Sequence, residues 1–494
     1  MTKNSSEFKN PPLYLYNSLT RKKEEFKAFH PPNVSMYTCG PTVYDNLQIG
    51  NMRTYVLADV LRRILEFNGY KVRHVMNITD VGHLSGDNLG DSSQGEDRLE
   101  RGAKREGQTA WDIAKKYEES FKEDAKKLQL QVDEYPRATD HIKEQIKLIE
   151  ELEKNGYTYK ISDGIYFDTS KFEQYGAPGD LDQIKEGARV EPNPEKKNPS
   201  DFALWKFSKE GKRDMEWNSP WGIGFPGWSI ECSAMSMKCL TDAFAEGFNP
   251  SKFSTLDIHV GGEDLKQTHH PNEVAQSEGA TGKKFVNYWV HGTFLLVDGG
   301  RMGKSLGNAY NMADIEEKGF YAKDLRYLFY TAHYKTPLNF TWDALEGAKK
   351  SLARLRKECP NVSERNRGNP KKGSPYLMNF FSAINDDLNM PRALAVVWEL
   401  MENSSVEDSE KAILLSEFDK VLALDIYANE KESLEETSIP IESLPKDVRQ
   451  KIADREDFRK QKKFAEADGI RKQIEDLGYQ IKDTKDGVMV KRSN

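Results

Sequence analysis

The chain has 494 residues, of which 37% are hydrophobic and 31% are charged, and its formal net charge at pH 7 is −7. This length allows about two to four domains with separate cores, and a polar start at residues 1–10 with no run of 18 apolar residues anywhere argues against a secretory signal or a membrane span. The net charge argues against a non-specific nucleic-acid binder, and four cysteines without regular spacing favour a reducing, cytoplasmic location over a disulfide scaffold.

The first half of the chain predicts a parallel sheet. After an extended lead-in over residues 1–33, an apolar run predicts a strand at 34–39 that Gly40-Pro41 breaks. Apolar spacing then predicts a helix over 50–67, ended by Asn68-Gly69, and a valine-rich strand over 71–77. A strand, a helix and a strand at this spacing form a βαβ unit, whose carboxyl edge is the usual place for a site.

An insertion divides this sheet domain. The glycine-rich residues 82–108 predict a mobile loop, and a long helix is expected over 109–128. From Pro136 the pattern changes to a helix at 139–154, short strands around the Asp163-Gly164 turn, and a proline-rich loop at 178–201. We interpret 136–201 as an insertion between the two halves of one sheet domain.

The sheet is expected to resume at 202–205 and 217–228, with a helix at 229–240 and a further helix that begins at His269. Strands at 255–259, 285–290 and 294–297 should complete it. From about residue 309 the pattern is almost wholly helical, with amphipathic segments at 343–357, 376–384 and 392–401. An acidic linker (428–445), two helices (446–460 and 463–477) and a hairpin over 479–490 end the chain.

His269 and Glu273 lie four residues apart at the start of a predicted helix, so both side chains share one face. Such a pair supplies two of the four ligands that tetrahedral zinc requires. Cys39 lies at the end of a predicted strand, and Cys232 lies just past Gly227-Trp228 in the same half of the chain as the histidines, so these two thiols could complete the set. The alternative is two buried thiols beside a surface His-Glu pair.

Two segments are suited to phosphate. Residues 299–308 include Gly303-Lys304-Ser305 after a predicted strand, but the P-loop spacing requires a glycine where the chain has Asp298, which argues against a P-loop NTPase. Its glycines and Lys304 could still hold a polyphosphate through backbone N–H groups and charge. The alternative, an exposed turn, fits poorly with a Gly-Met-Gly-Lys-Ser run beside an apolar strand. The second segment, Gln48-Ile49-Gly50-Asn51, opens the first helix, where free N–H donors favour an anion.

The charge is uneven along the C-terminal part. Residues 401–445 carry 3 basic and 12 acidic side chains, whereas residues 446–494 carry 14 basic and 10 acidic ones. A basic end on an acidic protein is a modest indication of a polyanionic partner, and a solvated helical face is an equal explanation.

Six segments in one order resemble cysteinyl-tRNA synthetase, a class I aminoacyl-tRNA synthetase. They are residues 37–45, 48–51, 77–80, 227–235, 269–273 and 301–305. The resemblance covers nearly the whole chain. It implies an α/β fold: a Rossmann-like parallel-sheet catalytic domain with an insertion, an all-α C-terminal region, and a small α+β anticodon-binding end. The implied divisions are 1–135 and 202–308 for the catalytic halves, 136–201 for the insertion, 309–342 for a stem-contact region, 343–430 for a helical bundle, and 431–494 for the linker and anticodon-binding end.

The resemblance also implies roles for residues. The zinc ligands would be Cys39, Cys232, His269 and Glu273, with one Zn²⁺ per chain that selects the substrate thiol. Substrate cysteine would contact Trp228, Thr79 and Gly40. ATP, carried with Mg²⁺, would meet Gly50, Gly261, Asp264 and Lys304, and the catalytic set would be Gln48, Asn51, Arg301 and Lys304. The implied partner is tRNA(Cys), with candidate contacts at Arg449, Arg455, Arg459, Lys462 and Lys463; a cytoplasmic monomer is expected.

Two signatures depart from the family pattern. Gln48 stands where the family commonly has histidine, and it can donate a hydrogen bond but carries no charge. Residues 301–305 read Arg-Met-Gly-Lys-Ser instead of Lys-Met-Ser-Lys-Ser. Both changes predict an effect on rate more than on reaction type.

Three other functions fit parts of the pattern. A ligase that joins cysteine to an amino-sugar would share the catalytic body but lack residues 446–494. A non-catalytic tRNA- or zinc-binding protein would explain Gln48 and Gly303. A zinc hydrolase would use Glu273 as a base, but two thiolates would leave its metal poor at activating water.

Overall fold

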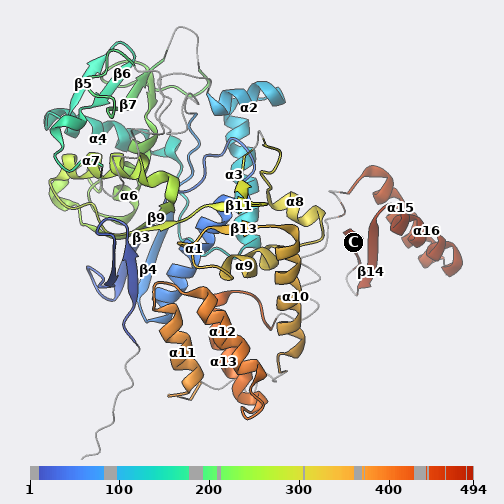
Figure 1. Ribbon diagram of the computed structural model, residues 1–494. Coiled ribbons are helices and arrows are strands. Elements are labelled where there is room, and N and C mark those ends of the chain that lie inside the picture. Colours follow the sequence, from blue (N-terminus) through green and yellow to red (C-terminus); the bar gives the residue numbers. More distant parts are fainter. Residues whose placement is uncertain are drawn as a thin grey trace, which may run out of the picture.

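A computed structural model describes residues 11–82, 97–176, 193–208, 213–303, 306–360, 370–371, 373–427, 441, 444–461, 463–484 and 487–492. The predicted loop at 178–201 and the linker at 428–445 fall largely outside these residues. Figure 1 shows the elements in the colours of the sequence. None of the helices in the described part combines the length and apolarity that a membrane span requires.

The centre of the molecule is a four-stranded parallel sheet in the order β10-β9-β3-β4. Its strands are β3 (Asn33–Thr38), β4 (Lys71–Met76), β9 (Leu256–Gly262) and β10 (Val286–Gly292). Tyr37 of β3 lies opposite Val75 of β4 and His259 of β9. The register therefore brings the carboxyl ends of all four strands to one edge, as the predicted βαβ unit requires.

Helix α1 (Ile49–Phe67) connects β3 to β4, as predicted. Its apolar side chains recur at helical spacing and are buried, and Gly69 ends it in a left-handed conformation with φ 90°. The lead-in is a hairpin, β1 (Tyr14–Asn17) with β2 (Lys22–Glu25), which the sequence pattern did not predict.

The prediction of a loop over 82–108 is wrong for its second half, and residues 83–96 lie outside the described residues. Residues 98–106 form helix α2 (Arg98–Glu106), which Asp97 caps by accepting bonds from Leu99 N and Glu100 N. Leu99 and Ala103 are buried there, so glycine content alone was a poor guide. Helix α3 (Ala110–Lys127) follows, as expected.

The insertion has its own antiparallel sheet in the order β5-β6-β7-β8. Its strands are β5 (Thr158–Ile161), β6 (Gly164–Phe167), β7 (Phe202–Phe207) and β8 (Gly224–Pro226). We expected 202–205 and 217–228 to return to the parallel sheet, which is wrong. Strand β7 pairs with β6 and with β8, so the insertion sheet extends past residue 201. Strand pairing is non-local, and a short apolar run does not identify its partner.

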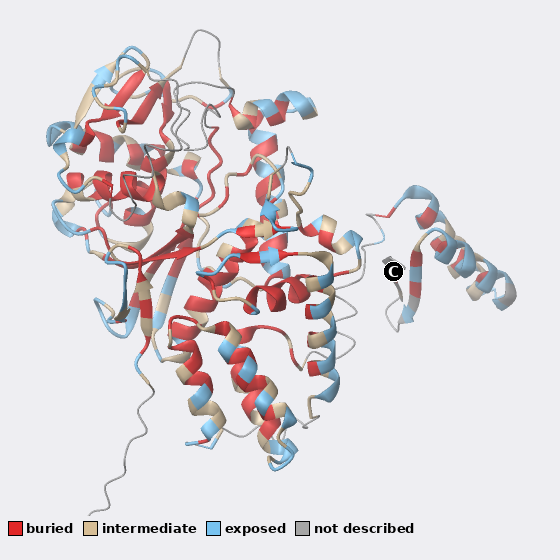
Figure 2. Cartoon of the chain, in the orientation of Figure 1, coloured by how far each residue is buried: buried red, intermediate tan, exposed pale blue. Residues whose placement is uncertain are grey.

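Three helices join the insertion to the parallel sheet. They are α4 (Ile142–Lys154), α6 (Trp228–Leu240) and α7 (His269–Thr281), and α4 packs against both of the others. Figure 2 shows buried residues in these helices and in the central strands. Short 3-10 helices lie at Ala138–His141, Thr169–Lys171, Pro250–Lys252 and Glu263–Lys266.

The strand expected at 294–297 is not part of the parallel sheet. Strand β11 (Leu295–Val297) instead lies between β12 (Gly300–Arg301) and β13 (Leu338–Phe340), a strand within the region predicted to be helical. The remaining elements there are α8 (Met312–Glu317), α9 (Ala322–Tyr330), α10 (Trp342–Glu358), α11 (Pro375–Ile384), α12 (Met390–Glu402) and α13 (Asp408–Leu422).

The C-terminal residues form a small body with a separate core. It contains α15 (Lys446–Lys460), α16 (Phe464–Asp476), and the hairpin β14 (Tyr479–Thr484) with β15 (Gly487–Arg492). Its buried side chains, among them Val448, Ile474 and Val490, pack on one another. The predicted two helices and hairpin are confirmed.

Candidate active site and metal centre

The four predicted metal ligands come together at the carboxyl edge of the sheet. Cys39 follows β3, Cys232 lies on α6, and His269 and Glu273 lie on the first turns of α7. One ligand atom from each lies within 4.8 Å of all the others, and all four residues are buried. The alternative of a surface His-Glu pair is therefore wrong.

The spacing of these atoms fits a tetrahedral cation. The Cys39 and Cys232 sulfurs are 3.8 Å apart, and Cys39 Sγ is 3.6 Å from Glu273 Oε1. His269 Nε2 is 3.2 Å from the same oxygen. Zinc–sulfur bonds of about 2.3 Å place two thiolates about 3.8 Å apart, so the donor set and its dimensions fit zinc.

Because the two thiols are buried, their ionisation would require a nearby cation. Burial raises the pKa of the Cys39 thiol well above its usual value, and it raises the pKa of Cys232 as well. Neither thiol would ionise there on its own at neutral pH. A divalent ion in the cluster would stabilise both thiolates, which is the ordinary coupling between metal binding and proton release.

Three histidines that we did not predict surround the ligand set. His259 Nε2 lies 3.0 Å from Glu273 Oε2, and His270 Nε2 lies 3.4 Å from Cys39 Sγ. His270 Nδ1 contacts His291 Nε2 at 2.7 Å. Burial lowers the pKa of His270 and of His291 well below the usual value, so both rings are neutral near pH 7.

Cys39, His259, His270 and Glu273 form a second group with metal-binding spacing. It shares Cys39 and Glu273 with the predicted set, so the two groups cannot hold independent ions. His259 meets the Glu273 oxygen that faces away from His269, which is the usual place of an outer hydrogen-bond partner. A histidine inside a predicted strand, as at position 259, was the signal that sequence reasoning missed.

The predicted substrate residues border this cluster. The Trp228 ring lies 4.2 Å from the His269 ring, centroid to centroid. Thr79 Oγ1 donates to Glu231 Oε2 at 2.9 Å and accepts from Asn77 Nδ2 at 3.1 Å. Asn77 and Glu231 were not predicted, and both are buried.

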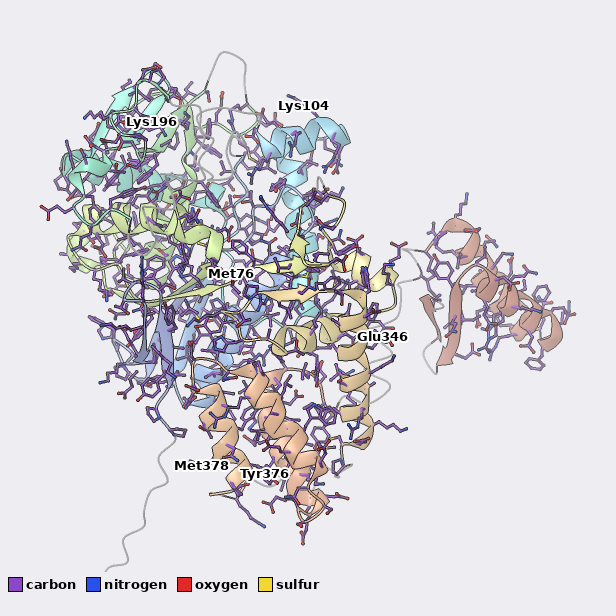
Figure 3. All side chains as sticks on the ribbon, in the orientation of Figure 1. Met76, Lys104, Lys196, Glu346, Tyr376 and Met378 are labelled. Atoms are coloured by element: carbon purple, nitrogen blue, oxygen red, sulfur yellow. The ribbon has the colours of Figure 1, made fainter. Side chains whose placement is uncertain are left out.

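Gly40 is a position where a side chain has no room. Its N–H donates to Asn77 Oδ1 at 2.8 Å, and a Cβ built on it would lie 1.7 Å from the Asn77 carbonyl oxygen. Met76, labelled in Figure 3, comes directly before Asn77 and its Cγ would lie 3.1 Å from that Cβ. The backbones that follow β3 and β4 therefore approach closely beside Cys39.

The two predicted phosphate segments meet. Gln48 precedes the first residue of α1, and a Cβ built on Gly50 would lie 2.5 Å from Met302 Cε. Arg301 and Gly303 are held in a turn by Asn308, whose side chain bonds Gly303 N and Arg301 O at 2.9 and 3.1 Å. Lys304 lies outside the described residues.

The remaining predicted nucleotide residues surround the same helix start. Asn51 is exposed in the first turn of α1, whose N-terminal end is favourable for anions. Gly261 lies directly against the His270 ring, since a Cβ built on Gly261 would lie 2.5 Å from that ring. Asp264 is exposed in the short 3-10 helix that follows β9.

Arg455, one of the candidate tRNA contacts, is not a surface cation. Arg455 is buried and holds both oxygens of Asp483 at 2.9 Å, while Arg459 contacts the same carboxylate. The Arg455 bond lowers the pKa of Asp483 to about 2. Arg455 is therefore a structural cation of the C-terminal body. Arg449 and Lys463 are exposed, and Lys462 lies outside the described residues.

Comparison with known proteins gives consistent results. The family model described as tRNA synthetases class I (C) catalytic domain matches residues 25–350. A protein of Burkholderia lata named cysteine–tRNA ligase 1 is 43% identical over 481 residues, which is 96% of each chain. A cysteine–tRNA ligase of Treponema denticola is 38% identical and covers 95% of this chain and 98% of its own.

A solved structure supports the fold alone. The methionyl-tRNA synthetase of Mycobacterium tuberculosis, in complex with methionyl-adenylate, matches with a TM-score of 0.53 and 14% sequence identity. The match covers 79% of this chain and 90% of that one.

Proposed function

This chain belongs to the cysteine–tRNA ligase family of class I aminoacyl-tRNA synthetases, and from that premise we propose that it activates L-cysteine with ATP and transfers the cysteinyl group to the 3′ end of tRNA(Cys). The observation that carries the proposal is the buried group of two thiols, an imidazole and a carboxylate at the carboxyl edge of the sheet. It lies beside the residues expected to bind the amino acid.

Cys39, Cys232, His269 and Glu273 would hold one Zn²⁺, because their donor atoms and spacing suit that ion. When bound, the ion supplies a soft Lewis acid that accepts the thiolate of cysteine far better than the hydroxyl of serine. Selection by ligand softness would make a separate editing step unnecessary, since a pocket that relies on shape separates near-isosteres only about 100-fold.

The chain's own residues would position the rest of the amino acid. The Trp228 ring beside His269 would cover the substrate side chain. Thr79, whose hydroxyl is fixed between Asn77 and Glu231, would meet the backbone end of the substrate. Gly40 would let the backbones that follow β3 and β4 approach each other beside the amino acid, because a side chain there clashes with Asn77.

ATP, carried with Mg²⁺, would bind where the two signature segments meet. Gly50 and Asn51 would offer the start of α1 to the phosphates, while Gly261 and Asp264 would bind the nucleoside. Gln48, Arg301 and Lys304 would stabilise the charge on the phosphates. The substrate carboxylate then attacks the α-phosphate in line; the new C–O–P bond forms as pyrophosphate leaves, and the product is cysteinyl-adenylate.

The terminal ribose hydroxyl of tRNA would take the acyl group from the adenylate and release AMP. The basic C-terminal body would read the anticodon loop, where unstacked bases are accessible. The same folded body argues against the amide-forming cysteine ligase considered above. We also propose that the enzyme acts as a cytoplasmic monomer.

Pyrophosphate exchange tests the first step. We expect exchange that depends on cysteine, with a preference over serine of at least about a thousandfold, and one zinc per chain by metal analysis. Charging of a tRNA(Cys) transcript tests the second step. An exchange rate that is equal with serine, or an amide product without charged tRNA, would contradict the proposal.

A further inference from the structure

A hydrogen-bonded chain connects the insertion to His269 from the side opposite the metal cluster. Tyr175 Oη donates to Asn272 Oδ1 at 2.7 Å. Asn272 Nδ2 donates to Ser229 Oγ at 3.2 Å, and Ser229 Oγ lies 3.3 Å from His269 Nδ1. Ser229, His269 and Asn272 are buried, and Tyr175 is half-buried.

The direction of these bonds decides which ring nitrogen of His269 can bind a cation. His269 Nε2 faces Glu273 Oε1 at 3.2 Å, inside the ligand cluster. A neutral imidazole that offers a lone pair at Nε2 must carry its proton at Nδ1. The Ser229 oxygen has two lone pairs, so it can accept from Asn272 and from that Nδ1–H at once.

The chain begins outside the catalytic sheet. Tyr175 follows the last short helix of the first half of the insertion, and its ring stacks on Phe202 of β7 with centroids 6.1 Å apart. This stacking fixes the hydroxyl that meets Asn272. The insertion sheet therefore holds one end of a chain whose other end is a proposed metal ligand.

We propose that Tyr175, Asn272 and Ser229 are positioning residues for the metal centre, which hold His269 in the tautomer and orientation that present Nε2 to the ion. This inference rests on the ligand set of the proposed function. It adds that the insertion contributes to metal retention, although no ligand comes from it. Outer partners of this kind typically change metal affinity by about 10- to 100-fold.

The two helices provide a matched control. Ser233 lies one turn after Ser229 on α6, and it donates to Gln276 Oε1 of α7 at 2.7 Å, one turn after Asn272. The Ser233 bond joins the same helix pair but reaches none of the four ligands. If Ser229 served only helix packing, removing either hydroxyl would have the same effect on the metal.

The experiment measures zinc affinity of the full chain by competition with a chromophoric chelator. The variants are Ser229→Ala, Tyr175→Phe and their combination. The controls are Ser233→Ala and Tyr159→Phe, since the Tyr159 hydroxyl donates to Asp201 within the insertion. The visible spectrum of the cobalt-substituted protein reports the ligand field independently of activity.

We expect Ser229→Ala and Tyr175→Phe each to weaken zinc binding by about tenfold or more, and to change the cobalt spectrum while one ion still binds. Because Tyr175 acts through Ser229, the double variant should lose no more than Ser229→Ala alone. The zinc affinity of the controls should stay within about threefold of wild type, below the effect of an outer partner, because neither hydroxyl bonds to a proposed ligand in the hydrogen bonds given above.

Unchanged affinity in both variants, additive losses in the double variant, or equal losses in the Ser233→Ala control would each overturn the inference. A wild-type chain that binds no zinc would overturn the proposed ligand set as well. A wild-type chain that binds zinc as tightly as its variants would overturn only the positioning role.

Discussion

Single residues decide what this site can select, and the two thiols are the clearest case. Cys39 and Cys232 come from segments 193 residues apart, yet their sulfurs lie 3.8 Å from each other in a buried cluster. Two buried thiols with raised pKa values contribute little to substrate binding until a bound cation displaces their protons. A metal ion bound by the proposed ligands would therefore supply the charge of the site as well as its shape.

Replacement of one thiol tests this dependence. Cys232→Ser should lower the zinc content and raise the KM for cysteine in pyrophosphate exchange by more than about tenfold, because a hydroxyl is a poor zinc ligand. Cys239→Ser is the matched control, since Cys239 lies two turns further along α6 and contacts Glu134 instead. Full activity and full zinc content in Cys232→Ser would refute the ligand assignment.

Asp124 is a residue whose ionisation should oppose folding. It is buried on α3, and burial raises the pKa of its carboxyl to about 7. Its folded pKa lies above the unfolded one, so its favourable contribution is complete below about pH 4 and is lost as the pH rises through about 7. At pH 8 the folded chain must hold a charge that burial disfavours.

Asp124→Asn should therefore stabilise the protein at pH 8 by about 2–4 kcal/mol and have little effect at pH 4. Urea unfolding midpoints at both pH values measure this difference. Glu119→Gln removes an exposed carboxyl from the same helix and should change the midpoint little. A stability gain that is the same at both pH values would rule out the titration of Asp124 as its cause.

At the scale of elements, the site depends on how closely the backbones approach after the parallel strands β3 and β4. A Cβ at Gly40 would meet the Asn77 carbonyl at 1.7 Å, which neither backbone can avoid without moving Cys39. Gly40→Ala should destabilise the chain by about 2–4 kcal/mol, and it should reduce zinc retention.

The control for this substitution is Gly347→Ala. Gly347 lies within α10 and has open space around its Cα, so alanine there should stabilise the helix by about 0.5–1 kcal/mol. Thermal unfolding of the two variants measures both effects. Normal stability and zinc content in Gly40→Ala would mean that the strand ends can separate.

Elements that depend on local pattern were predictable from the sequence, and those that depend on distant partners were not. Helix α1 was predicted because its apolar spacing and Asn68-Gly69 ending are local signals. Strands β7 and β11 were assigned to the wrong sheet because their partners lie elsewhere in the chain. The four proposed metal ligands were likewise predicted from a family resemblance, whereas the roles of His259, His270 and Asn77 became visible only through their contacts.

At the scale of the whole molecule, the C-terminal body has a core of its own, so its surface can be changed without opening the catalytic core. Arg449 and Lys463 are its exposed cations among the proposed tRNA contacts. Contacts with phosphates act through charge, so removing them should weaken tRNA binding and reduce its salt dependence together. Reactions without tRNA should be unchanged.

The double variant Arg449→Glu, Lys463→Glu should therefore raise the KM for tRNA in the charging reaction by about tenfold or more and flatten its dependence on salt concentration. Pyrophosphate exchange with cysteine should stay at the wild-type rate. Lys27→Glu with Lys252→Glu changes the net charge equally at exposed positions of the catalytic part, and it should leave the KM for tRNA close to wild type. Equal losses in both double variants would assign the effect to net charge, and an unchanged KM in the first would exclude these two cations from the tRNA surface.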